Sequence, residues 1–151
     1  MGTTKDLLIN LAGNKILYMV VSTWAITQTI KVIIGVIRER KFDFRWFVGT
    51  GGMPSSHAAT VSALTTAVGL SFGTGSVLFV ITGVFSLIVI FDAQGVRRST
   101  GKQAEILNKM MNDIYWKHRI QEDRLKELLG HAPLEVLVGT LTGIAIAFLL
   151  W

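Results

Sequence analysis

Apolar residues gather in four stretches of this chain of 151 residues, at 16–37, 57–72, 76–91 and 134–151. A helix needs about 20 residues to cross the hydrocarbon core of a bilayer, and about 17 at the least. The first and last stretches reach that length. The middle two are shorter and are separated only by residues 73–75 (GTG), which predicts a tight helical hairpin whose ends reach into the interface. The pattern predicts about four membrane spans.

The segment between residues 91 and 134 is charged and polar, and it is the one long connection that this pattern predicts. Apolar residues recur at helical spacing within it, which predicts an amphipathic cytoplasmic helix. They are Leu107, Met110, Met111, Ile114 and Tyr115. Residues 124–129 form a second amphipathic segment. Each segment either lies along the membrane surface, covers the bundle, or is an ordinary solvated helix.

Composition supports a membrane protein. Hydrophobic residues make up 50% of the chain and charged residues 17%, against about 25% charged in soluble domains. We therefore expect one all-α membrane-embedded domain, a helical bundle, over residues 1–151.

Residues 2–14 are only weakly apolar and predict no cleavable signal peptide. The absence of cysteine excludes disulfides and thiolate chemistry. The net charge of +5 suits nucleic acid or an anionic membrane, and the apolar runs favour membrane lipids, so we expect no nucleic acid partner.

The basic residues predict the topology. With four spans, 12 of the 15 lysines and arginines fall in the first and third connections, and only Lys5 and Lys15 lie on the side of the termini. The positive-inside rule then places both connections in the cytoplasm. When the candidate phosphate ligands are set aside, eight basic residues remain in the two connections, against two on the side of the termini. The ligands set aside are Arg38, Arg97, Arg98 and Lys102.

Residues 51–57 (GGMPSSH) place a histidine at the mouth of an apolar helix, behind glycines and two hydroxyls. Pro54 stops the preceding segment, and Ser55 or Ser56 can cap the helix. The free N–H groups of a first helical turn attract anions. This segment is therefore a candidate site at which His57 protonates a bound phosphate.

Lys31 and Arg38 are seven residues apart, so both can face one side of the first helix. An intramembrane lysine usually marks a functional site, although Lys31 is also close enough to the helix end to snorkel. Two adjacent arginines, Arg97 and Arg98, follow the third apolar stretch. They form either an anion clamp or a positive-inside anchor, and Lys102 is a further candidate ligand of a bound phosphate.

His131 precedes the last apolar stretch, with Glu135 four residues later. The carboxylate can accept a hydrogen bond from one ring nitrogen, which leaves the other basic and suited to act as nucleophile or base. The alternative for Glu135 is a simple complement to the helix dipole. His118 has no such neighbours, and we expect it to be a surface residue.

These motifs resemble those of the type 2 phosphatidic acid phosphatase (PAP2) superfamily, above all its divergent branch of small bacterial and plant proteins related to acid phosphatase and vanadium-dependent haloperoxidase. The resemblance covers nearly the whole chain. The family's first motif is lysine, six residues, then Arg-Pro, and here Lys31 and Arg38 match while Glu39 replaces the proline. The second, Pro-Ser-Gly-His, matches residues 54–57 (PSSH).

The third family motif is Ser-Arg, five residues, histidine, three residues, then aspartate. His131 matches, Glu135 replaces the aspartate, and Leu125 stands where the family has its phosphate-binding arginine. Residues 92–98 (DAQGVRR) resemble the divergent branch in particular. We therefore expect one of the two arginines that end this run to substitute for the missing one.

The resemblance implies a metal-independent hydrolase without a cofactor that acts on a phosphate monoester or pyrophosphate of an isoprenoid lipid or glycerolipid. The distribution of basic residues places the site at the cytoplasmic face of the membrane, and we expect the cell membrane of a bacterium. His131, oriented by Glu135, attacks phosphorus to form a phosphohistidine, and His57 protonates the leaving oxygen. The predicted phosphate ligands are Lys31, Arg38, Ser55, Ser56, Arg97, Arg98 and Lys102.

Three other functions stay open. The altered third motif suits a non-catalytic protein that binds or transports a lipid phosphate. The same oxyanion pocket can hold vanadate, as in an oxidase. Gly139 and Gly143 have the spacing of a close-packed membrane helix pair, which suits a structural bundle, and they leave homo-oligomerisation open. Three scattered histidines predict no zinc site, although magnesium bound with the substrate is compatible with the sequence.

Overall fold

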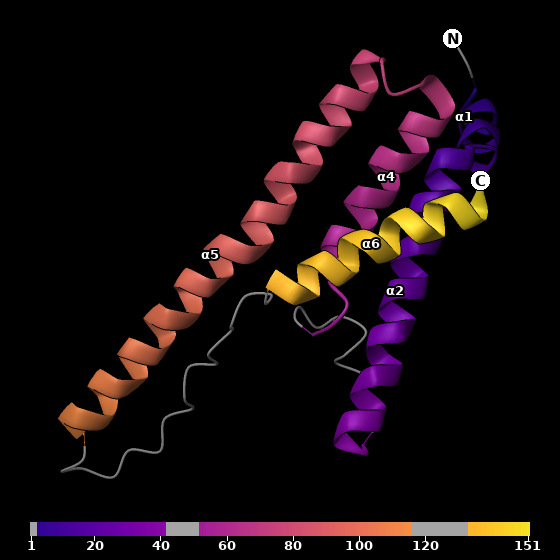
Figure 1. The fold of residues 1–151 in the computed structure, drawn as a ribbon. Helices are drawn as coiled ribbons and strands as arrows, with labels where there is room; N and C mark the ends of the chain where they lie inside the picture. The colour runs from indigo at the N-terminus through magenta and orange to yellow at the C-terminus, as the bar shows by residue number, and fades with distance from the viewer. Residues whose placement is uncertain (1–2, 42–51, 116–132) are drawn as a thin grey trace.

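The computed structural model describes residues 3–41, 52–115 and 133–151. Every secondary-structure element in these ranges is a helix, which confirms the all-α prediction (Figure 1). The helices are α1 (Thr4–Ala12), α2 (Lys15–Glu39), α4 (Ser56–Phe72), α5 (Val77–Tyr115) and α6 (Pro133–Leu150). The four apolar stretches of the sequence correspond to α2, α4, the first half of α5, and α6.

Helix α4 lies at the centre of the bundle and contacts α2, α5 and α6. It runs antiparallel to both α2 and α5, and α6 lies across it (Figure 1). The fully buried side chains of Met19, Ala63, Ala67 and Ala147 bring α2, α4 and α6 together in one cluster. Alanine side chains on α4 let its neighbours approach closely, as is typical of helix packing in membranes.

Large apolar side chains cover the outside of the bundle. Trp24 on α2 and Phe85 on α5 are each 50% exposed, whereas Thr23 and Ser86 are buried. A soluble helix shows the opposite pattern, so these faces suit a lipid environment. Three described helices are long and apolar enough to cross a membrane: α2, residues 77–94 of α5, and α6. The fourth expected span is α4, which has 17 residues and is enclosed by the other three.

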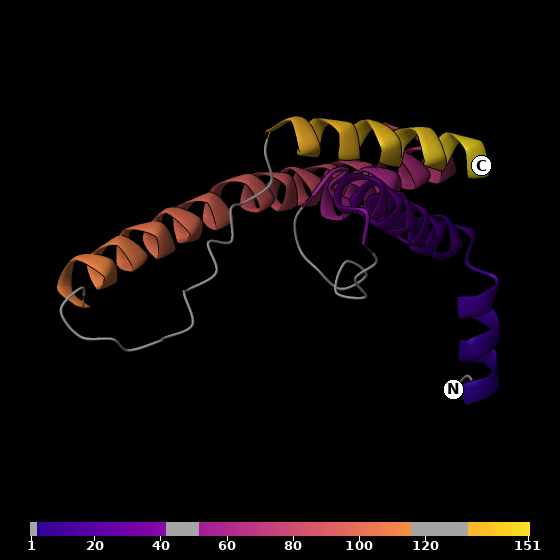
Figure 2. The same cartoon turned by 90° about the horizontal axis from the view of Figure 1, so that it is seen from below.

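Helix α5 corrects the prediction that the third helix ends near Phe91 and that a separate amphipathic helix follows. The helix continues without interruption to Tyr115, because residues 92–115 contain no proline, and Gly95 and Gly101 weaken a helix without ending it. The predicted amphipathic helix is therefore the last part of α5. Figures 1 and 2 show that this part points away from the bundle. The segment 124–129 lies outside the described residues.

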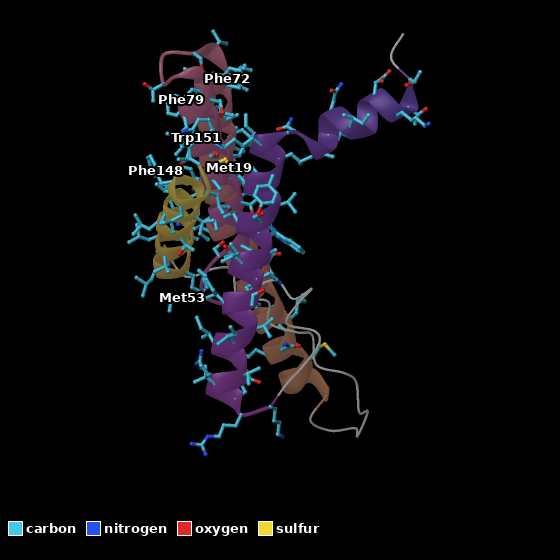
Figure 3. All side chains as sticks on the ribbon, turned by 90° about the vertical axis from the view of Figure 1, so that its right-hand side faces the viewer. Met19, Met53, Phe72, Phe79, Phe148 and Trp151 are labelled. Atoms are coloured by element: carbon cyan, nitrogen blue, oxygen red, sulfur yellow. The ribbon has the colours of Figure 1, made fainter. Side chains whose placement is uncertain are left out.

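Helix α1 is a short element that the apolar pattern did not predict. Thr3 caps it, and its side chain and that of Asp6 form a reciprocal capping box. Gly13 ends α1 and Asn14 caps α2, so the chain turns sharply between them. Figures 2 and 3 show α1 directed away from the bundle.

The start of α2 and the end of α6 are joined at the same end of the bundle as α1. The Lys15 ammonium donates a hydrogen bond of 2.7 Å to the Trp151 carbonyl oxygen and lies 3.8 Å from the centre of the indole ring. In Figure 3, Trp151 and Met53 mark opposite ends of α6. The candidate site lies at the Met53 end.

Candidate phosphate site

The first turn of α4 is built by Ser55. Its side chain accepts a hydrogen bond of 3.4 Å from the backbone N–H of Ala58, which confirms that one of the two serines caps this helix. Ser55 and Ser56 are buried, at 0% and 7% exposure, whereas the following residue, His57, is exposed. The two hydroxyl residues thus lie inside the bundle, and the histidine lies at its surface.

Helix α6 packs directly on the backbone of this turn. The Ser55 N–H donates a hydrogen bond of 3.0 Å to the carbonyl oxygen of Glu135. A Cβ on Gly139 would lie 2.5 Å from the Ser55 carbonyl oxygen, and a Cβ on Gly143 would overlap the backbone of Ala59. The close-packing spacing of these glycines is therefore used within the chain. It brings Glu135, the described residue of the third motif, against Ser55 of the second.

Lys31 brings the first motif to the same place. Its side chain is 7% exposed, and a Cβ on Gly52 would lie 3.8 Å from Lys31 Cγ. The lysine stem therefore lies against the loop that leads into α4. This burial favours a functional lysine over one that snorkels to the interface.

The other basic candidates occupy different positions. Arg38 is exposed and lies two turns beyond Lys31, about 10 Å further along α2. Arg97, Arg98 and Lys102 belong to α5, beyond the buried Ala93, where the helix leads away from the bundle (Figure 1). The nucleophile candidate His131 lies outside the described residues, as do His118 and Leu125. The structure therefore brings Lys31, the two serines and Glu135 to one end of the bundle, and it places Arg38 farther out.

Sequence reasoning missed a buried polar face on α2. Thr23 and Thr27 are fully buried and Gln28 is 5% exposed, directly before Lys31. The signal was available, because Thr23, Thr27 and Lys31 are spaced four residues apart in a predominantly apolar helix. The role of Gly52 beside Lys31 was also missed.

The chemistry of the converging groups suits an oxyanion. A buried lysine, two hydroxyls and a helix N-terminus all present positive charge or hydrogen-bond donors. Within the described ranges, no group of three or more acidic, histidine or cysteine side chains could hold a metal ion. The arrangement favours the binding of an anion such as phosphate.

Comparison with known proteins agrees with this chemistry. The sequence profile described as "Divergent PAP2 family" matches residues 12–146. The chain belongs to this family. Membership confirms the resemblance seen in the sequence motifs and makes the chain a membrane protein related to phosphatases.

Similarity to a curated protein supports the same assignment. The chain is 44% identical over 134 residues to the "Uncharacterized membrane protein YuiD" of Bacillus subtilis (strain 168). The match covers 82% of this chain and 85% of the relative. Its name supports the membrane assignment and specifies no reaction. No solved structure matches the chain.

Proposed function

We propose that this protein is a membrane-bound phosphatase that hydrolyses a lipid phosphate or pyrophosphate at the cytoplasmic face of a bacterial cell membrane. One observation carries the proposal: α2, α4 and α6 bring one described residue of each family motif, namely Lys31, Ser55 and Glu135, to the same end of the bundle. The Ser55 N–H bonds to the Glu135 carbonyl, and Lys31 is buried against Gly52. The concentration of basic residues in the two sequence segments that follow the apolar parts of α2 and α5 supports the cytoplasmic orientation.

In the proposed reaction, a ring nitrogen of His131 attacks phosphorus and the bond to the leaving oxygen breaks. His57 gives its proton to that oxygen. Glu135 accepts a hydrogen bond from the other ring nitrogen of His131 and orients the imidazole. Water then attacks the phosphohistidine, His57 takes a proton from the water, and inorganic phosphate leaves.

Binding of the phosphate oxygens falls to the positive and donor groups around α4. The Lys31 ammonium neutralises charge, and the hydroxyls of Ser55 and Ser56 contribute hydrogen bonds with the helix N–H groups. We include Arg38, which requires the end of α2 to approach α4 in the complex. The further ligands of the proposal are Arg97, Arg98 and Lys102. One of the α5 arginines would replace the family arginine missing at Leu125.

The test is phosphate release by purified protein in nanodiscs with a panel of isoprenoid and glycerolipid phosphates. We expect release that orthovanadate inhibits, and a loss of at least about 10³-fold in the His131→Ala variant, because removal of a nucleophile usually abolishes turnover. The matched control is His118→Ala, at the histidine that the sequence predicts to lie on the surface, with activity retained.

Two results would contradict the proposal. Full activity of a folded His131→Ala protein would exclude the phosphohistidine mechanism. Tight binding of lipid phosphates by the wild-type protein, without hydrolysis of any of them, would instead support the alternative of a binding or transport protein, which the replacement of the family arginine by Leu125 already favours.

A further inference from the structure

The hydroxyl of Thr27 differs from the other helix hydroxyls around it. Thr23 donates a hydrogen bond of 2.8 Å to the Met19 carbonyl oxygen one turn earlier, and Thr29 does the same to Ala25. Thr27 is fully buried, and its Oγ1 has no hydrogen-bond partner among the described residues. A buried hydroxyl without a partner costs stability, so a bound group that accepts its hydrogen bond would stabilise the protein.

The register of α2 against α4 shows where Thr27 lies. Met19 packs against Ala63 and Ala67, and Lys31 lies against Gly52. Because the two helices are antiparallel, a residue four positions before Lys31 in α2 lies level with a residue about four positions after Gly52. Thr27 therefore lies at the level of the first turn of α4. It shares the buried face of α2 with Lys31, one turn away.

We propose that Thr27 is a further ligand of the bound phosphate, and that its hydroxyl donates a hydrogen bond to a non-bridging oxygen. This inference rests on the proposed function, because it needs an oxyanion at the first turn of α4. An oxyanion there accepts hydrogen bonds from the helix N–H groups and pairs with Lys31. It also supplies the acceptor that the buried hydroxyl lacks. No family motif includes this position.

The proposal predicts opposite effects on binding and on stability. Thr27→Val removes the hydroxyl and keeps the shape of the side chain. We expect it to weaken orthovanadate binding by about 10-fold or more, because a hydrogen bond to a charged group is lost. We also expect it to raise the Tm of the anion-free protein by at least about 2 °C, because an unsatisfied buried group is removed.

Two variants serve as controls. Thr23→Val changes a fully buried threonine on the same face, one turn deeper, whose hydroxyl already bonds to Met19. We expect it to leave vanadate affinity unchanged and not to raise the Tm. Thr27→Ser keeps a hydroxyl and should retain most of the affinity.

The measurement is calorimetric titration of orthovanadate into the protein in nanodiscs, with thermal unfolding of the same samples. Wild-type affinity in a folded Thr27→Val protein would overturn this inference alone and would leave a structural water as the partner of the hydroxyl. A wild-type protein that binds no vanadate would overturn the proposed function and this inference with it.

Discussion

Two of the interfaces of helix α4, those with α6 and with α5, are built in different ways. Against α6, glycines bring one backbone onto another, so that Gly139 meets Ser55 and Gly143 meets Ala59. Against α5, hydroxyl groups make the contact: Thr65 Oγ1 lies 2.7 Å from Ser86 Oγ and donates to the Thr82 carbonyl oxygen at 3.1 Å. Backbone atoms cannot move aside as side chains can.

This difference explains which interface positions the site. Ser55 and Glu135 belong to the α4–α6 interface, where the hydrogen bond between their backbones fixes the spacing of two family motifs. The α4–α5 interface holds a helix whose outer apolar face is exposed and whose last part leads away from the bundle. We expect changes at the first interface to disturb the site strongly and changes at the second to weaken the bundle with less effect on it.

The largest effect expected is that of Gly143→Ala. The new Cβ would overlap the Ala59 backbone, so the helices must separate, and overpacking of this kind costs about 1–3 kcal/mol or more in the free energy of unfolding. Unfolding of the purified protein by titration with sodium dodecyl sulfate measures it. The matched control is Gly83→Ala on α5, where a Cβ meets nothing within 4 Å. That variant should be neutral or slightly stabilising. Equal losses in the two variants would refute the contrast.

A smaller effect is expected from Thr65→Val at the α4–α5 interface. The variant loses the hydrogen bonds to Ser86 and to the Thr82 carbonyl, which should cost about 1 kcal/mol, since such bonds between membrane helices are weak. The same titration gives the value. Thr82→Val is the control, because that hydroxyl bonds only within α5 among the described residues. A Thr65→Val loss as large as that of Gly143→Ala would show that both interfaces are equally rigid.

The smallest effect lies at α1, outside both interfaces. The backbone N–H and the hydroxyl of Thr3 both donate hydrogen bonds to the Asp6 carboxylate. These bonds, the backbone one more strongly, lower the pKa of that carboxyl below its ordinary value. Because this pKa is lower in the folded state, the ionised carboxylate stabilises the cap at any pH above the unfolded-state pKa of about 4. The stabilisation is lost as the pH falls through the folded-state pKa. The protection of the α1 amides from hydrogen exchange, measured against an unstructured peptide at the same pH, should therefore fall below about pH 4. In Asp6→Asn, this protection should already be low at neutral pH. Unchanged protection in both cases would contradict this role of the cap.

The elements that the sequence predicted well are the helices that are apolar over their whole length. The stretches at 16–37 and 134–151 became α2 and α6, and Ser55 caps α4 as its residue type suggested. Helix α5 was predicted too short because a change from apolar to charged residues marks the edge of the membrane and does not end a helix. Helix α1 was missed because it is short and only weakly apolar.

The sequence by itself determined the membrane character, the family and the residue types of the site, because hydropathy and motif spacing are local properties of the chain. Lys31, Ser55, Ser56, His57 and Glu135 could be selected in this way. Only the tertiary structure decided that Ser55 bonds to the backbone of Glu135, that Gly52 lies beside the Lys31 stem and that the Thr27 hydroxyl is buried without a partner among the described residues. The physical reason is that these contacts depend on which helix faces meet, and small residues far apart in the chain determine how closely those faces approach.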